Sequence, residues 1–494
     1  MASPYETSAG IVQFGGLMQD GDGRNLDMRY AVDAINCDTT GGSLAPMKKG
    51  VQLAGDLPAP IGTLAVLYRR FHSVEAEKQV LIAAAGSSLY YRLMTDETWT
   101  EIYDQLTNDN LDYVAYEVNE ESATIDVLLM TNADDGMICV YGDDLTVTAV
   151  TTPYKFGILT RHAERIWGSG IEDYPDKLVY SGAYDPFNWT VDTQEELDVP
   201  EDAPGEILQP SWDGDSFVAL RTFGDQLLAF KKTRVWRILG TDPGTYIMKE
   251  QYGGGTIEEN SVVVFGSYAY MLSYNGLMRY DGADVIPFRQ QAIKDVVGRI
   301  NAPYINKAYA AMWGVKYCVA VPVDESTINN AIIVYDTVEH TFNVIEDVNV
   351  KAFLAADGVL YYTTDDTPGT VWQMGEGDSL PVTWISGYQD TGRKNAVKSA
   401  FIVYLTVHVD TIPDVTPEGG GDPIPQEQGF DMDVTIRTEK KEKKKTFTVL
   451  PGDKMKRLNI SNSGRWFQIE LNTETTLDWR LLGGVQIDME LDHD

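Results

Sequence analysis

The feature of this sequence that most constrains its fold is a unit that recurs along most of the chain. Each copy has a strand, a glycine-containing turn and a second strand rich in Tyr, Leu or Trp, which is typical of an antiparallel hairpin. The clearest copies are Val80–Tyr91, Phe217–Trp236, Val262–Tyr280 and Val350–Trp372. The turn glycines of these four copies and of three weaker ones are Gly86, Gly136, Gly182, Gly224, Gly266, Gly314 and Gly358.

The spacing of these glycines predicts a β-propeller. The first and the last are 272 residues apart over six intervals, or about 45 residues per interval, which is the length of a four-stranded propeller blade. Seven turns indicate seven blades, or six if two turns share one blade. An irregular array of β-sandwiches with accidental spacing is the alternative.

The chain has 494 residues, which suits a large repeat domain and one further domain. The composition shifts at Gly375–Ser379, which reads as a linker, and alternating strand patterns follow it. We therefore predict an all-β protein: a six- or seven-bladed β-propeller over residues 1–378, followed by a C-terminal β-sandwich over residues 379–494. N-terminal strands are expected to close the ring of blades, and the Pro/Gly/acid-rich loop 411–429 is expected to be mobile.

One amphipathic helix is predicted in this β-rich chain, over Arg289–Ile300. Ile293, Val296, Val297 and Ile300 fall on one face at helical spacing. We expect this helix to pack on the propeller.

The charge of the chain is strongly negative and unevenly distributed. The net charge is −35, and residues 381–494 contribute only −4 of it, with 14 Lys and Arg against 18 Asp and Glu. The first 380 residues therefore carry −31. This excludes broad phosphate binding by the propeller. Acidic walls suit a channel through which DNA slides without adhesion, or they serve solubility alone.

The sequence contains no pattern that indicates a catalytic or metal site. Its five histidines lack metal-ligand spacing and no nucleophile elbow occurs, so we expect no enzyme activity, no cofactor and no metal. Asp20–Asp27 has carboxylates that could meet a Ca²⁺, but it departs from the EF-hand pattern and reads more simply as a polar loop. No transmembrane stretch occurs, and the start of the chain lacks signal-peptide features, so synthesis in a cytoplasm is expected.

One basic run stands out against the acidic background. It lies between two alternating strands, at the expected tip of a hairpin, and is a candidate contact for DNA phosphate or for an acidic neighbouring subunit. A soluble turn that blunts a sheet edge is the alternative. The run consists of Lys440, Lys441, Lys443, Lys444 and Lys445.

Three segments resemble the tail hub, or nozzle, proteins of tailed bacteriophages, the packaged-DNA stabilisation family. Ala31–Gly50 has a similar Asn, Gly-x-Leu and Gly arrangement, although Lys48-Lys49-Gly50 stands where Arg-Pro-Gly is commoner. Glu164–Trp189 is similar to a strand pair of the family. Tyr252–Gly282 resembles a glycine-rich turn and two strands that precede an amphipathic helix.

The resemblance implies a structural virion protein in the phage tail, made in the host bacterial cytoplasm. Such a protein forms a ring, usually a hexamer, below the portal and adaptor, where it retains packaged DNA and forms the exit channel. Its partners are then copies of itself, the portal, the adaptor, other tail proteins and passing double-stranded DNA bound without sequence specificity.

Two other classes of protein remain open on the residues alone. One is a carbohydrate-active or glycan-binding propeller protein of the tail, which paired carboxylates in the propeller channel would favour. The other is a cellular scaffold propeller that binds partners through its loops.

Overall fold

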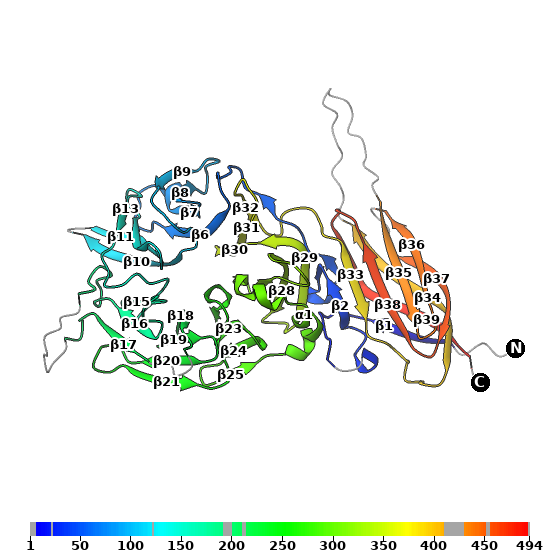
Figure 1. The fold of residues 1–494 in the computed structure, drawn as a ribbon. Helices are drawn as coiled ribbons and strands as arrows, with labels where there is room; N and C mark the ends of the chain where they lie inside the picture. Colours follow the sequence, from blue (N-terminus) through cyan, green and yellow to red (C-terminus); the bar gives the residue numbers. More distant parts are fainter. Residues whose placement is uncertain are drawn as a thin grey trace, which may run out of the picture.

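The computed structural model describes residues 6–20, 23–120, 123–190, 200–209, 214–409, 429–450 and 455–492. These residues form an all-β fold in which a ring of sheets lies beside a β-sandwich (Figure 1). This confirms the predicted fold class.

The ring is a propeller of seven blades, and in the first six of them the strands are hydrogen-bonded in chain order from the centre outward. The first three blades are β6 (Ile61–Tyr68), β7 (Gln79–Ala85), β8 (Ser88–Leu93), β9 (Thr100–Tyr103); β10 (Asp112–Glu120), β11 (Ala123–Asn132), β12 (Gly136–Tyr141), β13 (Val147–Ala149); and β14 (Ile158–His162), β15 (Arg165–Ser169), β16 (Lys177–Tyr180), β17 (Gly205–Leu208). The next two are β18 (Phe217–Phe223), β19 (Gln226–Lys231), β20 (Val235–Leu239), β21 (Ile247–Gln251); and β22 (Val263–Phe265), β23 (Tyr268–Ser273), β24 (Gly276–Tyr280), β25 (Val285–Pro287).

The sixth and seventh blades connect the ring to the rest of the chain. They contain β26 (Tyr309–Trp313), β27 (Lys316–Val321), β28 (Asn329–Asp336), β29 (Phe342–Val350); and β30 (Ala352–Ala356), β31 (Val359–Thr363), β32 (Val371–Gln373). The seventh blade takes its fourth strand, β5 (Val51–Gln52), from the N-terminal part of the chain, and β5 pairs antiparallel with β32. The ring therefore closes by hydrogen bonds between segments more than 300 residues apart.

The seven turn glycines fall in seven different blades, although they do not occupy equivalent turns. Gly224, Gly266, Gly314 and Gly358 lie between the first and second strands of their blades, whereas Gly86 lies between the second and third. All five have positive φ, such as 58° at Gly266 and 60° at Gly314. A two-residue hairpin turn needs this conformation, which glycine adopts without steric cost.

The β-sandwich consists of two sheets. One is the four-stranded sheet β1–β39–β34–β37, and the other is the outer part of a nine-stranded sheet, β2–β33–β38–β35–β36. Their bounds are β1 (Glu6–Ile11), β2 (Ala31–Ile35), β33 (Val382–Ser386), β34 (Val397–Val409), β35 (Phe430–Thr438), β36 (Glu442–Val449), β37 (Lys456–Gly464), β38 (Phe467–Thr473) and β39 (Trp479–Asp492).

The nine-stranded sheet is shared by the propeller and the sandwich. It begins with the sixth blade, β26–β27–β28–β29, and continues through β2 into the sandwich. Ile35 of β2 pairs parallel with Val344 of β29 and antiparallel with Thr383 of β33. One sheet therefore belongs to both parts of the molecule.

The prediction that residues 1–378 all belong to the propeller is wrong for the first strands of the chain. β1 pairs along its whole length with β39, and β2 lies between β29 and β33, so both belong to the sandwich. These two strands belong to the sandwich because they form hydrogen bonds with its strands, although they lie far from those strands in the sequence. The loop predicted at 411–429 lies outside the described residues except for Gly429.

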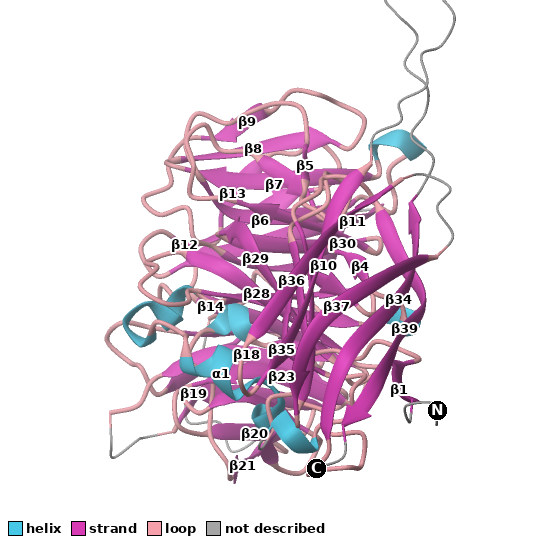
Figure 2. Ribbon diagram, turned by 90° about the vertical axis from the view of Figure 1, so that its right-hand side faces the viewer, coloured by secondary structure: helices cyan, strands magenta, loops and turns pink. Residues whose placement is uncertain are grey.

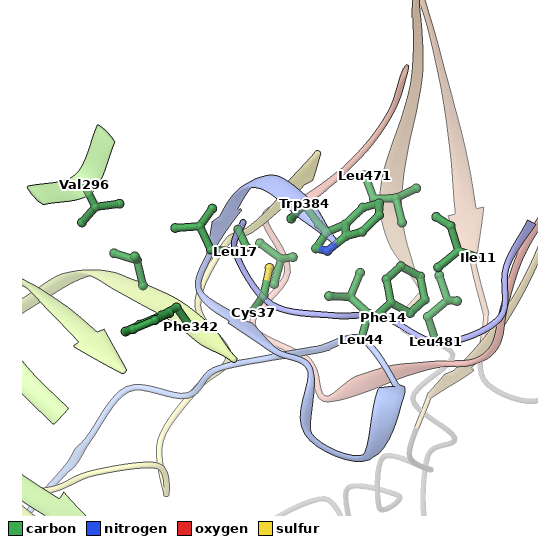
Figure 3. Packing of buried hydrophobic residues seen from close by; sticks show 14 of the residues in the cluster. Ile11, Phe14, Leu17, Cys37, Leu44, Val296, Phe342, Trp384, Leu471 and Leu481 are labelled. Atoms are coloured by element: carbon green, nitrogen blue, oxygen red, sulfur yellow. The ribbon is translucent and has the colours of Figure 1, made fainter. Parts of the chain in front are cut away.

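The joint between the two parts is packed with buried apolar side chains (Figure 3). Trp384 of β33 is fully buried, and its ring meets Phe14 edge to face at a centroid distance of 5.0 Å. Phe342 from the sixth blade and Leu471 and Leu481 from the sandwich belong to the same cluster. The propeller and the sandwich therefore share a core as well as a sheet.

The helical segment at Arg289–Ile300 is shorter than predicted. It consists of η5 (Gln290–Ile293) and α1 (Lys294–Gly298), and Ile293 and Val296 are buried in the joint. The remaining short elements are η1 (Gly23–Asn25), β3 (Cys37–Asp38), η2 (Thr40–Gly42), β4 (Ala45–Pro46), η3 (Glu75–Glu77), η4 (Glu259–Ser261) and η6 (Ala302–Lys307). Within the described ranges, every helix is too short or too polar to cross a membrane.

Candidate functional site

The innermost strands of the blades surround a central channel that holds two cavities. The cavity at the end where these strands begin has a volume of about 470 Å³, and a second one of about 510 Å³ lies further along them. Both are lined by Asp112, Asn260 and Tyr309. Polar side chains from connectors of several blades also line the first, among them Asn110, Glu258, Asn306 and Asp365.

A buried ionic cluster forms part of the channel wall. Arg221 on β18 donates from Nη1 to Glu259 Oε1 at 2.8 Å, and a hydrogen bond joins the carboxyl groups of Glu259 and Asp112. Asp112 Oδ2 also accepts from the backbone N–H of Leu159, at 2.7 Å. These contacts connect blades two, three and four to the connector before blade five.

Burial controls the proton affinity of this cluster. Burial raises the pKa of Glu259 well above its usual range, repulsion from Asp112 raises it further, and Arg221 opposes the shift. Burial also raises the pKa of Asp112, against the effect of Arg221. Both carboxyl groups therefore bind a proton more readily than an exposed carboxyl group does, and the positive charge of Arg221 offsets negative charge on the pair.

The spacing of the pair limits its chemistry. Glycoside hydrolases keep their two carboxyl groups about 5 to 9.5 Å apart, so that a sugar or water fits between them. Asp112 and Glu259 are joined by a direct hydrogen bond. Arg221 in addition donates to the backbone oxygens of Leu220, Glu259 and Val262. This arrangement fits a structural cross-link between blades better than an acid/base pair.

Glu258 is a third carboxyl group at this cavity whose pKa is raised. Burial raises its pKa to about 7, and Lys232 opposes the shift. This group therefore titrates near neutral pH. Sequence reasoning missed Asp112, Arg221, Glu258 and Glu259, because no local pattern separates the three carboxylates from the 74 acidic residues of the chain, or Arg221 from its 39 Lys and Arg residues.

The predicted lysine run lies at the far end of the sandwich, and only part of it forms the hairpin tip. Lys440 and Lys441 lie in the turn, whereas β36 begins at Glu442 because Glu442 still pairs with Arg437. The other three lysines therefore belong to β36, the terminal strand of the nine-stranded sheet. All five are exposed; they are Lys440, Lys441, Lys443, Lys444 and Lys445.

Two of these lysines lie on the face of β36 that continues the sandwich core. Lys443 pairs with Ile436 and Lys445 pairs with Val434, and directly opposite residues share a face. Lys445 Nζ donates to the backbone oxygen of Asn459 on β37 at 3.4 Å. Inward-facing charges at a sheet edge oppose pairing with further strands, which fits the edge-blunting interpretation of the run.

The candidate calcium segment Asp20–Asp27 is only partly described, since Gly21 and Asp22 lie outside the described residues. Within the ranges that the structure covers, no group of three or more His, Cys, Asp or Glu side chains is arranged to hold a metal ion.

Comparison with known proteins gives remote structural neighbours only. No family model matches the chain, and no curated protein matches it. Among solved structures, the Pan2 WD40 domain of Neurospora crassa is 11% identical, with a TM-score of 0.37, over 67% of this chain and 96% of that one. BamB from Moraxella catarrhalis is 9% identical, with a TM-score of 0.35, over 75% of this chain and 99% of that one. A chain from a mitotic checkpoint complex is 10% identical, with a TM-score of 0.40, over 64% of this chain and 93% of that one.

Proposed function

We propose that this chain is a structural subunit of a tailed-bacteriophage virion, in the tail hub or nozzle ring below the portal and adaptor. In that place it retains packaged DNA and forms the exit channel, without catalytic activity. The sequence resemblance at Ala31–Gly50, Glu164–Trp189 and Tyr252–Gly282 suggested this role.

The observation that carries the proposal is the continuous sheet between propeller and sandwich. Domains within one chain usually meet through modest interfaces and move relative to each other. Here the sixth blade continues through β2 into the sandwich, and Trp384 and Phe14 are buried at the joint. A part that bears the pressure of packaged DNA needs this rigidity, whereas an enzyme or a loop-binding scaffold does not.

The strong negative charge also supports the role. The first 380 residues carry −31 of the net −35. Like charge on a channel wall prevents a DNA duplex from adhering as it passes. This mechanism requires that acidic side chains cluster on the inner surface of the assembled ring.

The test is quantitative mass spectrometry of purified phage particles from the source of this chain. We expect about six copies for each twelve-fold portal, as for a closed cyclic ring. Absence of the chain from particles would refute the virion role.

A second candidate is a carbohydrate-active or glycan-binding propeller protein of the tail. The cavity of about 470 Å³ favours it, because polar groups including Glu258 and Asn260 converge there. The assay is turnover and binding of host cell-wall polysaccharide by the purified chain and by a Glu258→Gln variant. Loss of binding or turnover in the variant alone would support this candidate.

A further inference from the structure

The two ends of the molecule differ in the sign of their charge. Residues 429–465 contain ten Lys and Arg against five Asp and Glu, a net charge of +5. All other residues together carry −40. The positive charge is concentrated on the β35–β36 turn, β36 and β37, in a group of exposed side chains that we call the basic seam: Lys440, Lys441, Lys443, Lys445 and Arg457.

The basic seam lies on the side of the sandwich that faces away from the propeller. The nine-stranded sheet starts in the propeller and ends at β36, and the four-stranded sheet ends at β37. Figure 1 shows these two strands at the far side of the sandwich from the blades, and Figure 2, which views the sandwich end, shows β36 and β37 in front. The molecule thus has an acidic propeller at one end and a basic edge at the other.

Part of the positive charge in this region is already neutralised within the chain. Lys444 forms an ion pair with Asp433 at 2.5 Å, and Arg437 pairs with Glu442 and Glu470. These ion pairs lie beside the seam, and none of them involves one of its five members. The inward-facing Lys443 and Lys445 also oppose strand addition, so a partner is expected to bind through side chains rather than through β-pairing.

We infer that the basic seam binds the acidic propeller surface of a second copy of this chain, so that copies associate head to tail. Different surfaces then meet at each contact, which closes into a ring when the rotation between copies allows it. The inference identifies the contact surface between neighbouring copies in the ring proposed above, and it rests on that proposal. Opposite charges at the two ends both steer and orient such a contact.

A second copy fits the seam better than DNA does. A duplex that reached the seam would also approach a molecule with −40 elsewhere, and this repulsion acts over the Debye length of about 8 to 10 Å at moderate salt. The acidic surface of another copy, by contrast, is always present at the same concentration as the seam, because each chain carries both. Binding of DNA remains an outcome that the experiment detects.

The experiment compares the full chain with a charge-reversed variant, Lys440→Glu/Lys441→Glu/Lys443→Glu/Lys445→Glu. The matched control reverses four exposed lysines outside the seam and changes net charge equally: Lys49→Glu/Lys232→Glu/Lys294→Glu/Lys307→Glu. Sedimentation velocity at 50 and 500 mM NaCl measures association, and thermal unfolding verifies that each protein is folded. Zero-length carbodiimide cross-linking of mixed isotope-labelled copies identifies the lysines and carboxylates in contact.

The expected result is association of the wild-type chain at 50 mM NaCl that weakens at 500 mM. The seam variant should associate at least about tenfold more weakly. The control, which keeps the seam and makes the rest of the chain more acidic, should associate at least as strongly as the wild type does, and intermolecular cross-links should join the seam to propeller carboxylates. A folded seam variant that associates normally overturns the inference, as does a wild-type chain that is monomeric in both salts. Duplex binding by the seam without self-association assigns it to nucleic acid and likewise overturns the inference.

These outcomes are separable from the test of the proposed function. If particles contain the chain but the folded seam variant still associates, only the head-to-tail contact is wrong. If particles lack the chain while the seam controls association, the contact stands and the virion role falls.

Discussion

The raised pKa of Glu259 in the channel wall leads to a prediction about the stability of the chain. The folded pKa of Glu259 lies above its unfolded value, so the folded chain keeps a proton that the unfolded chain releases. The stability that comes from this proton is fully present below the unfolded pKa, which is near 4.5, and is lost as the pH rises. A Gln side chain still donates to Asp112 and accepts from Arg221, but it does not titrate. Glu259→Gln should therefore stabilise the propeller increasingly as the pH rises.

The magnitude follows from the linkage of one proton. Each pH unit between the unfolded and the folded pKa changes the folding equilibrium about tenfold, so the gain of the variant over the wild type should grow by about 1.4 kcal/mol per pH unit above the unfolded value, until the folded pKa is reached. Urea unfolding followed by tryptophan fluorescence measures it, since Trp167 is buried in the third blade. Glu75→Gln is the control, because the Glu75 side chain is 87% exposed.

Parallel stability profiles for Glu259→Gln and the wild type would refute this reasoning. They would mean that Glu259 is ionised in the folded chain and forms an ordinary ion pair with Arg221. A large loss of stability in the Gln variant at pH 7.5 would lead to the same conclusion.

Three further predictions follow from other parts of the structure. Trp384→Ala should cost about 3 to 5 kcal/mol, because a fully buried indole leaves a cavity at the joint; urea unfolding gives the cost, and limited proteolysis should then cut between propeller and sandwich. Burial lowers the pKa of His162, so the unfolded chain binds an extra proton below about pH 6.5 and stability falls with falling pH there; His162→Gln should show a flatter profile from pH 6.5 to 5. Lys443→Val/Lys445→Val should aggregate, as light scattering detects, because the inward charges no longer protect β36; normal solubility would contradict that role.

The periodic part of the fold was predictable from local sequence. Tight turns such as those at Gly266 and Gly314 require positive φ, so glycines recur at a spacing that the blade length sets. Gly182 is different, because it follows β16 without a positive φ. The number of these turns predicted seven blades, or six if two turns shared one blade, and the structure has seven. The buried side of the short helix was also predictable, since Ile293 and Val296 follow helical spacing.

The channel cluster was not predictable in the same way. Asp112, Arg221 and Glu259 come from segments about 40 to 150 residues apart, and they meet only because the innermost strands of successive blades converge. Nothing in the flanking residues distinguishes these side chains from exposed ones. The lysine run was visible as a run, but its division between turn and strand depended on the register in which Arg437 pairs with Glu442.

The strands at the start of the chain explain both the error in the domain division and the rigidity of the molecule. β1 pairs with β39, near the other end of the chain, and β5 completes the last blade, so the N-terminal segment holds the sandwich and the ring at once. The strand β2 lies between β1 and β5 in the sequence, and it pairs with both β29 and β33. The propeller is in effect inserted into the sandwich, with both of its chain connections fixed in sheets. Bending at the joint would therefore break strand pairing and expose the core around Trp384 together, which is why a load applied to the sandwich should be transmitted to the ring of blades.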